Sequence, residues 1–181
     1  MVHLRSLFTD NDLMAEVEKH VLRSYRIKEI SSIIWMVTYR CNLKCTHCYE
    51  GSSKPRKGEL STYRAMELIK ELSTVGKPLL FISGGEPLLR DDICLILKES
   101  VEKGMRVILS SNGTLIDDEV ADKIAEIGVS YVTLPLYGPR EFHDHFTRVP
   151  GSFNKVIEAF NRLYERGVKT GIKSIATVKT A

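Results

Sequence analysis

Short apolar runs alternate with amphipathic segments through most of the chain, from about residue 31 onward. The apolar runs predict five strands, at residues 33–39, 78–83, 106–110, 131–136 and 170–178. Their nearly continuous apolar character is typical of parallel strands that are buried on both faces. The regular exchange of strand and helix signals therefore predicts an α/β fold with a parallel sheet.

The segments between the predicted strands repeat apolar residues at helical spacing. The first opens near Ser61 and aligns Ala65, Ile69 and Leu72 on one face, and three more helices are expected to begin at residues 91–92, 117 and 152. Each of the four is followed by a helix-terminating glycine, at Gly76, Gly104, Gly128 and Gly167. A further helix is expected over residues 10–24. Repeated βα units build either a barrel or an open doubly wound sheet.

The composition fits a globular protein and speaks against several partners. Of the 181 residues, 43% are hydrophobic and 27% charged, and a net charge of +3 without a basic stripe argues against nucleic acid. The longest apolar run, residues 33–37, is too short to span a membrane, and the first residues do not resemble a signal peptide. We therefore expect a cytoplasmic protein with a leading helical segment (residues 1–30) and a core domain (residues 31–181).

Three of the four cysteines fall within eight residues, as Cys41, Cys45 and Cys48. They are too close in sequence to join distant parts of a fold, but they can converge on one soft metal centre. The C-x3-C-x2-C spacing gives a cubane cluster three ligands and leaves one iron open for chemistry. A structural zinc site with His47 as fourth ligand is an alternative, although its position beside Cys48 makes convergence awkward. The remaining Cys94 is expected on an apolar helix face.

The unusual polar and glycine residues all follow predicted strands. These segments are the cysteine loop and residues 84–87, 110–114 and 137–139. In parallel α/β folds the carboxyl ends of the strands share one rim, where ligands bind. The four segments therefore predict a single site on that rim.

In its cysteine triplet the chain resembles the radical S-adenosylmethionine (SAM) superfamily, and the resemblance extends over about residues 31–178. It implies a partial (β/α) barrel, a [4Fe-4S] cluster on Cys41, Cys45 and Cys48, and SAM on the open iron. His47 falls where the family usually has an aromatic residue near the adenine. Because the family builds six βα units, the chain is expected to be incomplete after about five strands, with its last strand as an exposed edge.

A second set of motifs resembles the family's SAM pocket. The sequence Gly84-Gly85-Glu86-Pro87 matches the GGEP motif of the family. Its glycine backbone would approach the methionyl part of SAM, and Glu86 would hold either the SAM ammonium group or the local loop. Three residues match the segment that faces the ribose and carboxylate in relatives, namely Ser110, Ser111 and Asn112. No catalytic residue is assigned.

Within the superfamily, residues 138–144 and 151–153 resemble haem and haem d1 biosynthesis enzymes and peptide maturases. This implies an enzyme that cleaves SAM reductively, with electrons from an external donor of the ferredoxin or flavodoxin type. The resulting 5′-deoxyadenosyl radical would abstract hydrogen from a small-molecule or peptide substrate, with a tetrapyrrole side chain or a peptide favoured. A shortened fold that binds the cluster and SAM without turnover is the alternative.

Overall fold

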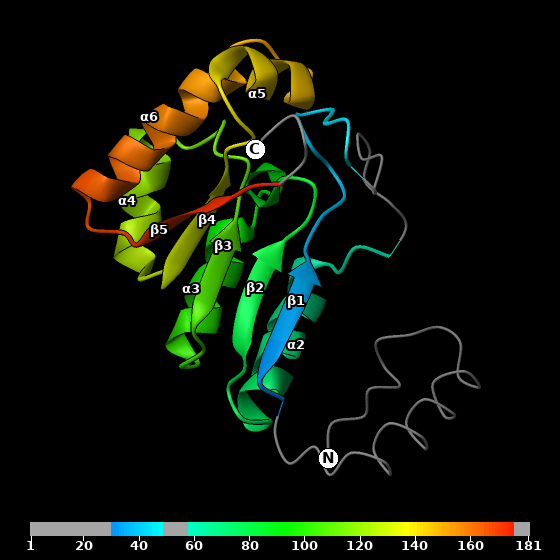
Figure 1. Ribbon diagram of the computed structural model, residues 1–181. Coiled ribbons are helices and arrows are strands. Elements are labelled where there is room, and N and C mark those ends of the chain that lie inside the picture. Colours follow the sequence, from blue (N-terminus) through cyan, green and yellow to red (C-terminus); the bar gives the residue numbers. More distant parts are fainter. Residues whose placement is uncertain (1–29, 49–57, 176–181) are drawn as a thin grey trace.

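The computed structural model describes residues 30–48 and 58–175, which form a parallel sheet with helices packed against it (Figure 1). The strands are β1 Ser32–Met36, β2 Leu79–Ser83, β3 Val107–Ser110, β4 Tyr131–Pro135 and β5 Thr170–Lys173. They lie in sequence order across the sheet, without the reversal of a doubly wound fold, which is the order of a (β/α) barrel. The expected α/β class, with the strand order of a partial (β/α) barrel, is confirmed.

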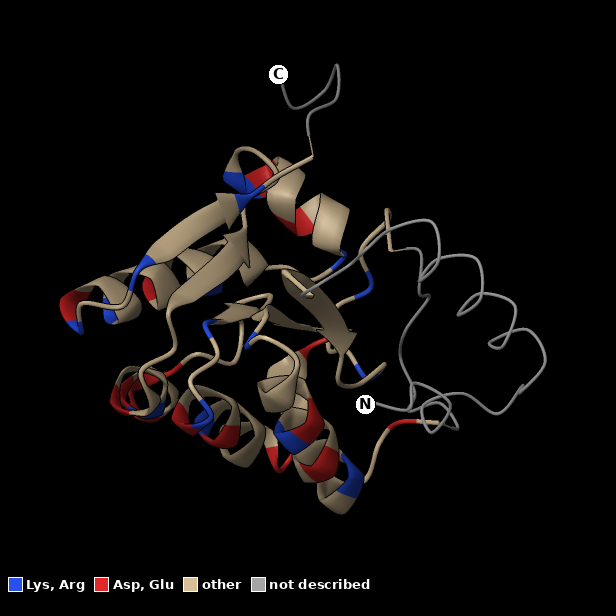
Figure 2. Ribbon diagram, turned by 90° about the horizontal axis from the view of Figure 1, so that it is seen from below, with Lys and Arg blue, Asp and Glu red and all other residues tan. Residues whose placement is uncertain are grey.

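Four long helices cover one face of the sheet (Figures 1 and 2). They are α2 Thr62–Thr74, α3 Ile93–Glu102, α4 Asp118–Ile127 and α6 Ser152–Glu165. Their outer surfaces carry charged residues of both signs (Figure 2). Between helices and sheet lie side chains that are at most 2% exposed, among them Leu80, Ile82, Leu109 and Leu134 from the strands and Ile69, Ile96, Ile124 and Leu163 from the helices. The apolar residues that recur at helical and strand spacing in the sequence therefore pack into one core.

The first strand ends three residues earlier than expected, at Met36. After Met36 the backbone forms hydrogen bonds with two other segments of the chain. Gly85 N donates to Thr38 O, and Tyr39 N donates to the side chain of Glu59 at Oε1, both at 2.8 Å. These contacts replace a regular strand ladder and lead the chain into the cysteine loop.

Two short helical elements lie where none was expected. Helix α5, Arg140–Thr147, follows β4, and the 3-10 turn η2, Pro87–Leu89, follows β2. The predicted helix at residues 10–24 and the predicted end of the fifth strand at residues 176–178 lie outside the described residues. Within the described ranges, no helix is both long enough and apolar enough to cross a membrane.

The parallel register brings the carboxyl ends of the strands to one edge of the sheet. Ser110 at the end of β3 pairs with Thr133, and Pro135 at the end of β4 pairs with Lys173 at the end of β5. The loops that follow these strands meet there, together with α5 (Figure 1).

Candidate active site

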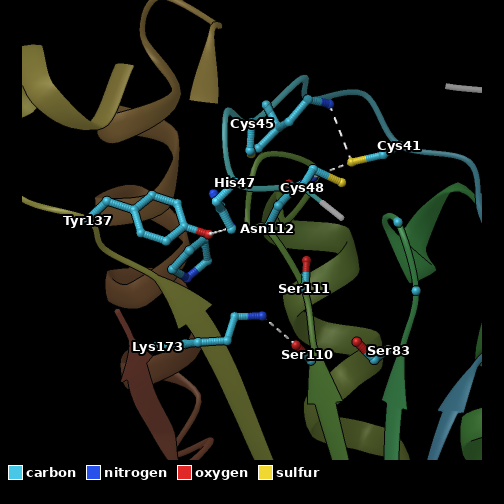
Figure 3. Close-up of a pocket in the computed structure, with 14 residues that line it drawn as sticks. Cys41, Cys45, His47, Cys48, Ser83, Ser110, Ser111, Asn112, Tyr137 and Lys173 are labelled. Carbon is cyan, nitrogen blue, oxygen red and sulfur yellow. Dashed lines mark hydrogen bonds between the residues drawn. The ribbon is translucent and has the colours of Figure 1, made fainter. Parts of the chain in front are cut away.

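The carboxyl ends of the strands surround one pocket (Figure 3). Nine of the predicted site residues line it, namely Cys41, Cys45, His47, Cys48, Gly84, Gly85, Ser110, Ser111 and Asn112. The wall is completed by Leu43 and Tyr137, which belong to the predicted rim segments, and by three residues that were not predicted for the site, namely Ser83, Pro135 and Lys173. Glu86 and Pro87 do not line the pocket but are buried behind its wall. The structure thus brings the predicted rim segments to one place.

The cysteine loop is held on the end of α5, the helix that was not expected. Lys44 N donates to Thr147 O at 3.2 Å, and Thr46 N donates to Phe146 O at 2.9 Å. Both acceptors belong to the last turn of α5, whose carbonyls have no partner within the helix. The helix end therefore anchors the loop at two points between its first and last cysteine.

N–H groups surround the sulfur of Cys41. Leu43 N donates to its Sγ at 3.4 Å, and Asn112 Nδ2 lies at 3.8 Å. The Asn112 amide also donates to Asn42 Oδ1 at 2.8 Å, Asn42 Nδ2 donates to Thr114 Oγ1 at 2.7 Å, and Thr114 Oγ1 donates back to Asn112 Oδ1 at 2.7 Å. This closed ring ties the cysteine loop to the end of β3, and donors to sulfur favour the thiolate, which is the form that binds metal.

The two glycines of the GGEP motif are required by close contact with backbone. A Cβ on Gly84 would lie 2.4 Å from Thr38 O, and a Cβ on Gly85 would lie 2.2 Å from Arg40 O. Gly85 N donates to Thr38 O at 2.8 Å, and Glu86 N donates to Arg40 O at 2.7 Å. Only residues without a side chain allow the loops after β1 and β2 to pack this closely.

Glu86 is fully buried, and its carboxylate accepts three hydrogen bonds from the protein. Oε1 accepts from Ser111 Oγ at 2.9 Å and Leu88 N at 3.1 Å, and Oε2 accepts from Asn112 N at 2.6 Å. Burial raises the pKa of Glu86, while the hydrogen bonds from Asn112, Leu88 and Ser111 oppose that rise. Of the two roles expected for Glu86, these contacts fit the holding of the local loop.

His47 joins a group of aromatic side chains supplied by α5 and the loop before it. Its ring stacks on Phe146 with 4.7 Å between centroids, and it meets Tyr137 edge-on at 4.9 Å. Tyr137 Oη lies 3.2 Å from His47 Nε2 (Figure 3). Burial, followed by the three neighbouring thiols, raises the pKa of Tyr137, so the phenol keeps its proton. The imidazole is thereby oriented in the pocket, and its expected place beside an adenine stays a prediction.

Lys173 is the most informative residue that was not predicted. It lies at the end of β5, and its ammonium donates to Ser110 Oγ at 2.7 Å (Figure 3). Although the residue as a whole is exposed at the sheet edge, burial lowers the pKa of its ammonium, while Glu86 and Cys45 oppose this by attracting the charge. Among the residues that line the pocket it is the only lysine or arginine.

The three thiols of the pocket fit a cationic cluster. Burial raises the pKa of Cys41, and burial together with Cys41 and Cys48 raises the pKa of Cys45 to about 11. Three thiolates therefore require a compensating positive charge, which a bound iron cluster supplies. Within the described residues no three histidine, cysteine or acidic side chains are grouped to hold a single metal ion. In the cubane proposed for this site each thiolate would bind a different iron, and the fit rests on the shared pocket and the N–H donors.

These features define an α/β protein of the barrel type whose strand ends carry a cysteine-lined cofactor pocket. The family model described as "Radical SAM superfamily" matches residues 35–179, and the chain belongs to this superfamily. The resemblance of the chain to that superfamily is confirmed.

Named relatives lie in the expected branch. The Fe-coproporphyrin III synthase of Methanosarcina barkeri is 39% identical over 159 residues, which are 87% of this chain and 40% of the relative. The mycofactocin maturase MftC of Mycobacterium tuberculosis is 33% identical over 141 residues, which are 78% of this chain and 36% of the relative. The solved structure "Native anSMEcpe with bound AdoMet" has a TM-score of 0.67 and 28% identity, covering 79% of this chain and 43% of that one. The chain spans about two-fifths of the length of these proteins.

Proposed function

We propose that residues 31–181 are the core domain of a radical SAM enzyme, in which Cys41, Cys45 and Cys48 hold a [4Fe-4S] cluster and the remaining pocket binds SAM. The observation that carries this proposal is the meeting of the three cysteines, the two motif glycines and the end of β3 in one pocket. When bound, the cluster supplies an electron for reductive cleavage of SAM to methionine and a 5′-deoxyadenosyl radical, which abstracts hydrogen from the substrate.

The protein's own residues contribute position and electrostatics. The N–H groups of Leu43 and Asn112 stabilise the Cys41 thiolate, and the end of α5 fixes the loop that carries all three sulfurs. The motif glycines line the pocket, and their backbone would face the methionyl part of SAM. Lys173, held beside Ser110, offers a positive charge to an anionic group of the bound molecules.

For the substrate we favour a tetrapyrrole side chain, with a peptide as the second candidate. The relative named for coproporphyrin is 39% identical to this chain, and the relative named as a mycofactocin maturase is 33% identical. The electron donor would be a ferredoxin or flavodoxin, and the reducing cytoplasm, where thiols stay free, is the compartment that suits this site.

The test is anaerobic reconstitution with iron and sulfide, followed by reduction in the presence of SAM. We expect about four irons and four sulfides per chain and formation of 5′-deoxyadenosine. Cys45→Ala should lose both, whereas the matched control Cys94→Ala should keep both, because Cys94 packs against the core on α3. A cluster without 5′-deoxyadenosine would support the alternative of binding without turnover. Stoichiometric zinc with no iron uptake would contradict the proposal.

A further inference from the structure

The cysteine loop separates two hollows of the surface. Cys45, His47 and Cys48 line the inner pocket, whereas Thr46, between them in sequence, lines a second hollow. The rest of the second hollow comes from α5 and the turn after it, namely Asp144, His145, Arg148 and Pro150. The cysteine loop therefore contributes to both this hollow and the pocket that the thiols line.

Two exposed cations, Lys44 and Arg148, lie at or near the second hollow. Arg148 lines the hollow, and the backbone of Lys44 is bonded to the residue before Arg148, since Lys44 N donates to Thr147 O at 3.2 Å; both Lys44 and Arg148 are exposed. The one carboxylate in the lining, Asp144, accepts hydrogen bonds at 2.7 and 2.8 Å from two backbone N–H groups at the start of α6. The positive end of that helix offsets its charge, and the other carboxylate of α5, Glu141, is outside the lining.

We propose that this hollow is the docking surface for an acidic protein that carries a single electron. The inference rests on the proposed function, because the electron is needed only if the thiols hold a cluster. In the step, one electron leaves the prosthetic group of the carrier, which is oxidised, and enters the cluster, which is reduced; no bond forms or breaks. Charge complementarity of this kind raises the rate of encounter between proteins that meet only briefly.

Binding is tested first, with an acidic bacterial flavodoxin in its oxidised form, so that no electron moves. Lys44→Glu and Arg148→Asn are measured by calorimetry at low salt; asparagine suits position 148, whose φ is 58°. Each variant should bind roughly tenfold more weakly and with less dependence on salt. The matched control Lys70→Glu, exposed on α2, should stay within about twofold of the wild type.

Electron delivery is tested next, by measuring the rate at which 5′-deoxyadenosine forms. Reduced flavodoxin drives the reaction in one arm, and photoreduced deazaflavin, a small neutral reductant that needs no docking surface, drives it in the other. Arg148→Asn, which lies outside the cysteine loop, should form 5′-deoxyadenosine more slowly than the wild type with flavodoxin and at an equal rate with deazaflavin.

The outcomes separate the two proposals. If the wild type forms 5′-deoxyadenosine with deazaflavin but the variants bind flavodoxin and react with it as the wild type does, the docking surface is wrong and the proposed function stands. If the wild type forms none with deazaflavin, the proposed function fails, and the docking surface falls with it.

Discussion

Replacing Glu86 with glutamine tests whether the buried carboxylate holds the loops of the pocket together. The substitution keeps the shape of the side chain and replaces one acceptor oxygen with an NH2 group. In one orientation this group faces Asn112 N, which lies 2.6 Å from Oε2, and in the other it faces Leu88 N, 3.1 Å from Oε1. Either way, one backbone N–H group loses its acceptor inside the protein.

A buried N–H group without an acceptor costs about 1–3 kcal/mol, and the remaining hydrogen bonds lose the strength that the negative charge gave them. We therefore expect the free energy of unfolding to fall by about 2 kcal/mol. In a chain of this length the melting temperature changes by about 2–4 °C per kcal/mol, so a decrease of about 4–8 °C should accompany it.

The assay is urea unfolding of the cluster-free protein at neutral pH, followed by circular dichroism. The control is Glu126→Gln, the same chemical change at an exposed position of α4, which should shift the free energy by less than about 0.5 kcal/mol. Equal urea dependence of the variants would show that the same transition is compared. If Glu86→Gln is as stable as the control, the carboxylate does not hold the loops and the interpretation of its contacts is wrong.

Three further substitutions test other contacts. Gly84→Ala places a Cβ 2.4 Å from a backbone carbonyl and should cost about 1–3 kcal/mol or more in thermal unfolding, whereas Gly58→Ala, also at positive φ but in open space, should cost less. Asp144→Asn should lower stability by about 1 kcal/mol through the loss of charge at the start of α6. Burial opposes ionisation of Asp144, yet its hydrogen bonds hold the pKa of this carboxyl below the usual range. The difference in stability between wild type and variant should therefore be present above about pH 4 and should vanish as the pH falls through that lowered pKa. Tyr137→Phe removes the hydroxyl beside His47 and should weaken SAM binding, measured by calorimetry, while leaving the iron content unchanged; loss of iron would contradict this role.

The elements with strong local signals could be predicted from the sequence. Asp117 accepts from Val120 N at 2.8 Å at the start of α4, and Gly128, at φ 79°, ends it, so both boundaries are set by residues within the helix's own sequence. The cysteine triplet located the pocket through its local spacing, the GGEP motif did so through its resemblance to the family, and the carboxyl ends of parallel strands share an edge that brings the two together.

Helix α5 was not predicted, although its sequence carries a weak signal. Pro139 precedes it, and Phe142 and Phe146 lie four residues apart on one side. The helix has eight residues and low apolar content, so its sequence alone does not distinguish it from a loop. Its position comes from contacts with the cysteine loop, about a hundred residues earlier in the chain.

Lys173 and Glu86 show what local sequence cannot provide. Lys173 reaches the pocket only because β5 pairs with β4 in a register that sets it across from Pro135. Glu86 lies in a loop motif where an acidic residue is ordinarily exposed, and only the packing of β3 against that loop encloses it.

The central claim is that three cysteines hold a cluster with one iron open to SAM. Its most direct test is electron paramagnetic resonance of the reconstituted, reduced protein, recorded before and after addition of SAM. The account predicts a signal of a reduced [4Fe-4S] cluster whose shape changes when SAM binds the open iron. An unchanged spectrum at saturating SAM would contradict it.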